Sequence, residues 1–129
     1  MENVDISWEE IEALSEKIAE DIKVSPIEPQ YLYAVDKQSL IPAMLISRKL
    51  GNIPITDNSR KSYVLFVSTF VDKGNTLAKA TDKSNCFATA ALFLKDGSAF
   101  SPDFFGRIGD IEEYYVFPWD QKGKESKKI

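Results

Sequence analysis

The sequence contains no histidine and only one cysteine, Cys86. Without histidine, the chain has no Ser-His-Asp or Cys-His nucleophile system, no histidine general base and no histidine-ligated metal. A single cysteine can form neither an internal disulfide nor a cysteine-rich zinc cluster. Any chemistry must therefore use carboxylates, hydroxyls, lysines and backbone amides.

Long hydrophobic runs are also missing. No stretch reaches the roughly 18 apolar residues that a membrane span needs. The first five residues are acidic, whereas the start of a secretory signal is basic. We therefore expect a cytoplasmic protein with no membrane partner.

The composition is that of an ordinary globular domain, with 43% hydrophobic and 28% charged residues in 129. We expect one domain over residues 1–121, followed by a basic disordered tail over residues 122–129, which hold four lysines and one glutamate. The net charge is nevertheless -4, so the body of the domain is acidic and specific nucleic-acid binding is disfavoured. Attachment of the tail to a polyanion is the alternative.

Helical and strand patterns alternate along the chain. Ser7 and Glu10 form a capping box, and an apolar stripe follows at helical spacing, so a helix is expected before the first strand. The stripe consists of Trp8, Ile11, Leu14, Ile18 and Ile22. A second helix is predicted over residues 40–50, where Leu40, Ala43, Met44, Ser47 and Leu50 share a face and Gly51 ends it. A third is expected over about residues 75–84.

Strands are predicted over residues 31–35, 62–68, 86–94 and 114–117, with a short edge piece at residues 53–56. Residues 62–68 are almost continuously apolar, which is typical of a strand covered on both faces. We therefore predict a three-layer α/β domain with a mostly parallel central sheet of about five strands, in which Cys86 is buried. The ligand site should lie in the loops after Val35, Ser68 and Leu94.

The loop after Ser68 carries the clearest functional pattern. Residues 71–77 follow a buried strand and open a helix, so their amides could converge on an anion at the helix N-terminus. Gly74 would allow a close backbone approach, and Thr76 could cap the helix and bind a phosphate oxygen. An ordinary strand-to-helix turn explains the same residues equally well.

Residues 64–77 resemble the phosphoribosyl-diphosphate signature of type I phosphoribosyltransferases, in which an apolar run and two acidic residues precede D-T-G-x-T. Residues 34–43 resemble the S-R-G-G-L-x-P-A loop of the purine enzymes. Residues 102–106 and 114–120 resemble their P-D-Y-Y and W-I-x-x-P-W-D ending. This ending is similar to that of the xanthine/hypoxanthine branch, and the resemblance covers most of residues 7–120.

The resemblance assigns roles by position. It implies that Asp72 is the acid/base residue near the reacting base and that Ser68 and Thr69 face the ribose. Lys95 would read a purine oxygen, with Tyr114 and Tyr115 at the base. The 5′-phosphate loop would be Asp72, Lys73, Gly74, Asn75 and Thr76, and the pyrophosphate loop Asp36, Lys37, Gln38 and Ser39. Tyr114, Phe117 and Trp119 could instead be aromatic core residues that pack under the C-terminal segment. Lys95 could instead be a solvated lysine in a turn.

Three departures from the family pattern affect the expected activity. Ser68 and Thr69 replace the two carboxylates that hold the ribose hydroxyls and Mg²⁺ as pyrophosphate leaves. Gln38 and Ser39 replace two glycines, and Asp36 puts a negative charge in a loop that would bind a polyanion. Only residues 52–61 remain where the family has a longer flexible hood.

We therefore expect a phosphoribosyltransferase-like protein that binds a nucleoside monophosphate or phosphoribosyl diphosphate with weak or lost transferase activity, with a homodimer as one option for its assembly. No cofactor should be bound tightly, and Mg²⁺ would be needed only by an active enzyme. One alternative is an active purine phosphoribosyltransferase. Another is a non-catalytic interaction protein whose aromatic C-terminal edge pairs with a copy of itself or with another chain.

Overall fold

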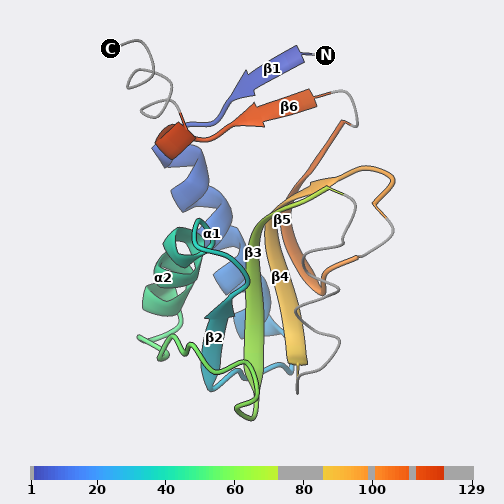
Figure 1. The fold of residues 1–129 in the computed structure, drawn as a ribbon. Coiled ribbons are helices and arrows are strands. Elements are labelled where there is room, and N and C mark those ends of the chain that lie inside the picture. The colour runs from blue at the N-terminus through green and yellow to red at the C-terminus, as the bar shows by residue number, and fades with distance from the viewer. Residues whose placement is uncertain (1, 73–85, 99–100, 111–112, 121–129) are drawn as a thin grey trace.

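The computed structural model describes residues 2–72, 86–98, 101–110 and 113–120 (Figure 1). Besides the helical residues 118–120, the described elements are two helices and six strands. In chain order they are β1 (Glu2–Asp5), α1 (Trp8–Val24), β2 (Tyr31–Ala34), α2 (Leu40–Lys49), β3 (Val64–Val71), β4 (Cys86–Lys95), β5 (Phe104–Gly109) and β6 (Glu113–Val116).

The central sheet has the order β2-β3-β4-β5, and all its neighbouring strands are parallel. Ala34 pairs with Val67, and Val71 pairs with Leu94. All but one of the residues of β3 are buried, as expected for a strand covered on both faces. The predicted mixed α/β architecture with a parallel sheet is confirmed. In the described residues this sheet has four strands rather than about five.

Both described helices lie on the same side of the sheet, where α1 packs on α2, β4 and β5 (Figure 1). The predicted cap is present, because the Glu10 amide donates to Ser7 Oγ at 3.1 Å. Ile11, Ile18 and Ile22 of the expected stripe are buried in the main core. Trp8 was expected there too, but 53% of it is exposed, and its ring contacts Trp119 near the end of the described chain.

The opposite side of the sheet also carries buried side chains, among them Val64 and Phe66. The helix expected over residues 75–84 would form a third layer on the sheet, but it lies outside the described residues. The basic tail, residues 122–129, lies outside them as well, as does the side chain of Cys86, whose burial stays a prediction.

Three features of the strands were not predicted from the sequence. A strand, β1, precedes the first helix, and β5 was not anticipated. The last strand, β6, lies outside the central sheet and pairs in parallel with β1, so that Val4 faces Tyr115. The two strands of this pair are far apart in the sequence and short, so neither carries a long local pattern of its own.

Helix α2 ends at Lys49, close to the expected position, and Gly51 follows with a φ of +89°, which suits glycine. Leu40 and Met44, two of the residues that predicted this helix, are each about half exposed. The edge piece predicted at residues 53–56 is present as an isolated parallel bridge between Leu32 and Ile55. Neither α1 nor α2 is long and apolar enough to cross a membrane.

Candidate functional site

The carboxyl ends of β2, β3 and β4 lie side by side in the central sheet. Because these strands are parallel neighbours, the chain leaves all three at the same edge of the sheet. Asp72 directly follows β3 and Asp96 directly follows β4, while Asp36 lies two residues after the end of β2. This edge therefore holds most of the side chains for which the sequence predicts a role.

The loop after β2 is closed by its own hydrogen bonds. Asp36 Oδ1 accepts from the Ser39 amide at 3.0 Å and from Ser39 Oγ at 2.5 Å. The Asp36 carbonyl accepts from the same Ser39 amide at 3.2 Å. Ser39 is completely buried and lies at the start of α2. Asp36 thus stabilises the turn that the family pattern would build from glycine.

Ser39 also joins this loop to β3. The Thr69 amide donates to Ser39 Oγ at 2.9 Å, and the Thr69 hydroxyl lies 3.3 Å from the same oxygen. Thr69 is completely buried, so its hydroxyl does not face solvent. We call Asp36, Ser39 and Thr69 the loop clamp. Ser68, the other residue expected at the ribose, is 2% exposed, and its hydroxyl donates to the Phe70 carbonyl at 3.3 Å.

The remaining residues of the expected pyrophosphate loop differ in their surroundings. Gln38 Oε1 accepts from Trp119 Nε1 at 3.1 Å, so the C-terminal aromatic segment is attached to the loop. The ring of Trp119 stacks on Phe117 with a centroid separation of 5.1 Å. Lys37 is exposed and forms no ion pair with another described residue. It is the loop's available cation.

Asp72 and Lys95 come together at the ends of β3 and β4, as their predicted roles at one site require. The Lys95 Nζ lies 4.0 Å from Asp72 Oδ1. The Lys95 side chain is only 12% exposed, whereas that of Asp72 is 53% exposed. The site therefore pairs a mostly buried lysine side chain with an accessible carboxylate. The other residues of the expected phosphate loop, Lys73, Gly74, Asn75 and Thr76, lie outside the described residues.

Tyr114 and Tyr115 point to opposite sides of β6, as successive strand residues do. Tyr114 is 56% exposed, while Tyr115 packs in the core with its ring centroid 5.0 Å from that of Phe93. Burial raises the pKa of the Tyr115 phenol, and the negative charge of Glu113, which accepts its hydrogen bond, raises it further. Aromatic packing thus describes Tyr115 and Phe117, and of the two tyrosines only Tyr114 presents an exposed ring.

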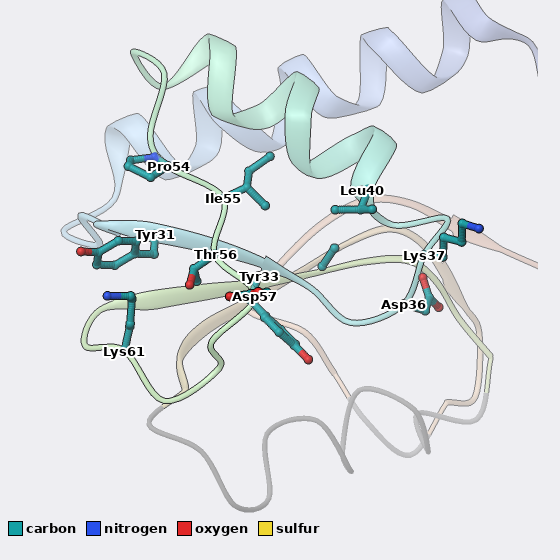
Figure 2. A pocket seen from close by; sticks show the side chains of 11 residues that line it. Tyr31, Tyr33, Asp36, Lys37, Leu40, Pro54, Ile55, Thr56, Asp57 and Lys61 are labelled. Atoms are coloured by element: carbon teal, nitrogen blue, oxygen red, sulfur yellow. The ribbon is translucent and has the colours of Figure 1, made fainter.

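A large hollow beside β2 was not anticipated from any motif. Its volume is about 800 Å³, and residues 54–57 and Lys61 form its far wall (Figure 2). The sequence predicts only a short edge piece and a shortened hood for this segment. The signal that could have drawn attention to it is the pair of alternate tyrosines, Tyr31 and Tyr33, on an edge strand.

The residues in place do not fit the Mg²⁺ that the fold family uses. Mg²⁺ prefers carboxylate and water oxygens in octahedral geometry. Ser68 and Thr69 offer buried hydroxyls at the relevant positions. Across the described ranges, no group of three or more acidic, cysteine or histidine side chains is close enough to hold a metal.

Comparison with solved structures identifies the fold. The purine phosphoribosyltransferase of Pyrococcus horikoshii is similar with a TM-score of 0.79 and 22% identity over 93% of this chain and 95% of that chain. The xanthine-guanine-hypoxanthine phosphoribosyltransferase of Helicobacter pylori gives a TM-score of 0.74 and 18% identity over 98% and 99%. A hypothetical protein from Neisseria gonorrhoeae with bound ppGpp gives 0.76 and 19% over 99% and 95%.

No family model matches the sequence, and no curated protein does. At this level of identity, structural similarity carries information about the fold. The chain therefore has the type I phosphoribosyltransferase fold over nearly its whole length, as the resemblance of its motifs implied.

Proposed function

We propose that this protein binds a purine nucleotide or a phosphorylated ribose at the carboxyl edge of its sheet and transfers phosphoribosyl groups weakly or not at all. The ligand would be a nucleoside monophosphate or phosphoribosyl diphosphate. Two of the similar structures were solved with purine nucleotides, the Neisseria gonorrhoeae protein with ppGpp and a mutant of the Trypanosoma cruzi hypoxanthine phosphoribosyltransferase with its product IMP. A shared fold alone does not carry a ligand from one protein to another.

The binding half of the proposal rests on the pair of Lys95 and Asp72. A lysine side chain that is mostly buried is stabilised by an anion or a hydrogen-bond acceptor close to its ammonium. At 4.0 Å, the Asp72 carboxylate balances the charge without a close hydrogen bond. A purine carbonyl oxygen could complete the coordination of Lys95 Nζ, while Asp72 would accept a hydrogen bond from the ring.

The loop clamp is the reason to expect weak or absent phosphoribosyl transfer. An oxocarbenium-like ribosyl group needs negative charge nearby, and a carboxylate supplies it where a hydroxyl does not. Thr69 is completely buried and bonded to Ser39, so this position offers neither charge nor access. The nearest carboxylate in the clamp, Asp36, is already bonded twice by Ser39. Leaving-group departure would therefore proceed without the stabilisation that the fold family supplies.

An active purine phosphoribosyltransferase is the second candidate. One observation favours it, because Asp72 and Lys95 are close together at the positions that the resemblance assigns to acid/base work and purine recognition. Such an enzyme would need Mg²⁺ from solution together with its diphosphate substrate. A homodimer and a cytoplasmic location stay predictions from the sequence under either candidate.

Two measurements on the full chain test the proposal. Calorimetric titration with guanosine, inosine and xanthosine monophosphates should give binding below millimolar concentration, with ligand density next to Asp72 in a soaked crystal. Pyrophosphate release from phosphoribosyl diphosphate and a purine base in the presence of Mg²⁺ should stay near background. Turnover on the order of 1 per second would establish the second candidate instead. No binding at millimolar concentration would rule out both.

A further inference from the structure

The hollow beside β2, which we call the β2 groove, is independent of the site proposed above except for the loop that closes one end. It has a volume of about 800 Å³, within the size range of small-molecule sites. Its lining includes Tyr33, Ala34, Leu40, Ile55 and Lys61 (Figure 2). The groove lies along the edge of the sheet, where β2 has a full strand partner on one side only.

The groove exists because the chain leaves this edge early. The Leu32 amide donates to the Pro54 carbonyl at 3.0 Å, and the Leu32 carbonyl accepts from the Thr56 amide at 2.8 Å. Directly afterwards, Thr56 Oγ1 accepts from the Asn58 amide at 3.0 Å and turns the segment. Pairing on this edge therefore stops after Leu32.

The next outward-facing residue of β2 is Ala34. In a parallel pair, alternate residues direct their backbone groups toward the same neighbour. The amide of Val35 donates to β3 and both groups of Leu32 point to the outer segment, so those of Ala34 point outward as well. Within the described residues, neither the N–H nor the C=O of Ala34 has a partner. Such groups normally bind water or a ligand.

Along the described part of this edge, Ala34 alone has both of its backbone groups open. On one side Leu32 is already paired, and on the other the chain turns at Asp36, whose carbonyl accepts from the Ser39 amide. An added peptide strand needs a row of open residues. A single donor and a single acceptor side by side match one edge of a small heterocycle instead.

Apolar groups lie above and below this edge. Figure 2 shows Leu40 and Ile55 on the α2 side and Tyr33 on the other side. Leu40 and Ile55 are 49% and 39% exposed, so they offer apolar surface that the chain itself does not cover. The Tyr33 ring is held by Phe66, with centroids 5.0 Å apart. A flat ring bonded to Ala34 would lie between these walls.

A lysine stands at each end of the groove. Lys61 lies with its Nζ 5.0 Å from the centroid of the Tyr31 ring, and Lys37 lies at the opposite end (Figure 2). Of the two carboxylates in the lining, Asp36 is bonded by Ser39, and Asp57 lies between the ends. An anionic substituent would therefore be accommodated at an end of the groove, where it meets an ammonium.

We propose that the β2 groove is a second ligand site, which takes a planar heterocycle with an adjacent hydrogen-bond donor and acceptor on one edge and an anionic substituent. The donor–acceptor edge pairs with the C=O and N–H of Ala34. The ring lies between Tyr33 and Leu40, and the anionic group contacts Lys61 or Lys37. Guanine nucleotides, whose N1–H and C6=O form such an edge, are suitable probes of this chemistry.

Backbone amide NMR of the full chain tests the site. Addition of 5′-GMP should shift the Ala34 amide, and 1-methyl-GMP, which lacks the N1 donor, should shift it at least fivefold more weakly. Leu40→Asp places a negative charge in the groove at an exposed position and should weaken the Ala34 response about tenfold. Met44→Asp, at a similarly exposed position one turn further along α2 and outside the groove lining, is the control.

The outcomes separate this site from the one at Asp72. Shifts at Ala34 that depend on N1 and on Leu40 support the groove, whether or not the Asp72 amide also moves. A shift at Asp72 alone overturns the groove and leaves the proposed function intact. A response at Ala34 that 1-methyl-GMP reproduces in full, or that Met44→Asp weakens as much as Leu40→Asp, also overturns the proposal.

Discussion

Replacement of Ser39 by alanine should destabilise the protein in a way that isolates the loop clamp. The variant removes the acceptor of the Thr69 amide, which lies 2.9 Å from Ser39 Oγ in a completely buried position. It also removes one of the two hydrogen bonds from Ser39 to the Asp36 carboxylate. A buried amide left without a partner costs about 1–3 kcal/mol. We expect the free energy of unfolding to fall by about 2 kcal/mol, and the Tm by roughly 6–10 °C.

Ser15→Ala is the matched control. Ser15 is as buried as Ser39, and its hydroxyl donates to the Ile11 carbonyl at 2.8 Å. That carbonyl lies one turn earlier in the same helix, where it can accept the helical amide bond, so the variant leaves no orphaned group. Alanine is also the better helix former, by about 0.5 kcal/mol. Ser15→Ala should therefore change the stability by less than about 0.5 kcal/mol.

Urea unfolding followed by tryptophan fluorescence measures both variants, and the slope of the free energy with urea shows whether the same surface is exposed. Equal losses for Ser39→Ala and Ser15→Ala would refute the clamp. An equally large loss of stability in Thr69→Val would also refute the clamp. A valine at this position keeps the backbone amide, and Ser39 still accepts its hydrogen bond. Thr69→Val should instead cost about 1 kcal/mol or less, since only the longer 3.3 Å contact is lost.

Three further predictions concern other parts of the molecule. Because burial holds the pKa of Tyr115 above its ordinary 10.0, its contribution to stability is complete below pH 10 and is lost as the pH rises further; Tyr115→Phe should flatten this alkaline loss in urea titrations at several pH values. Gly109→Ala would place a methyl group onto Tyr115 Oη and 2.7 Å from Cζ, so it should cost about 1–3 kcal/mol, and clearly less when Tyr115→Phe is also present. Lys95→Gln should weaken calorimetric binding of nucleoside monophosphates about tenfold, whereas Lys23→Gln, at an exposed lysine of α1, should leave it unchanged; equal effects would count against the nucleotide site.

The central architecture could be predicted because its signals are local. The apolar run of β3 and the Ser7–Glu10 cap each fall within a few residues, and both are confirmed. The strand β5 was missed because Gly106, Arg107 and Gly109 interrupt any apolar pattern in six residues. In the fold, Gly106 lets the strand approach Leu92, since an added Cβ would lie 2.6 Å from the Leu92 carbonyl oxygen.

The site could be predicted only as far as the order of motifs along the chain determines it. Parallel strands bring the ends of β2, β3 and β4 to one edge, so the loops and the proximity of Asp72 to Lys95 follow from topology. The bond between Ser39 and Thr69 joins positions 30 residues apart and depends on the depth to which each is buried. The open backbone groups of Ala34 depend on where a loop leaves the edge, which no residue pattern encodes.

The loop clamp also shows that the residues at positions 36, 39 and 69, which all differ from the family motif, are not independent of one another. In the sequence, the change to Asp36, the change to Ser39 and the loss of the acidic residue at Thr69 look like separate losses. In the fold, Ser39 Oγ donates to Asp36 and accepts from the Thr69 amide, so the three residues form one hydrogen-bonded unit. A carboxylate at position 69 would face the same hydroxyl that Asp36 already occupies. Asp36 is itself exposed to solvent, and a second carboxylate beside it would add repulsion between like charges. In this fold the carboxylate of the clamp lies in the loop after β2 and not on β3, so an acid at position 69 alone would not reproduce the arrangement of charge in the family motif.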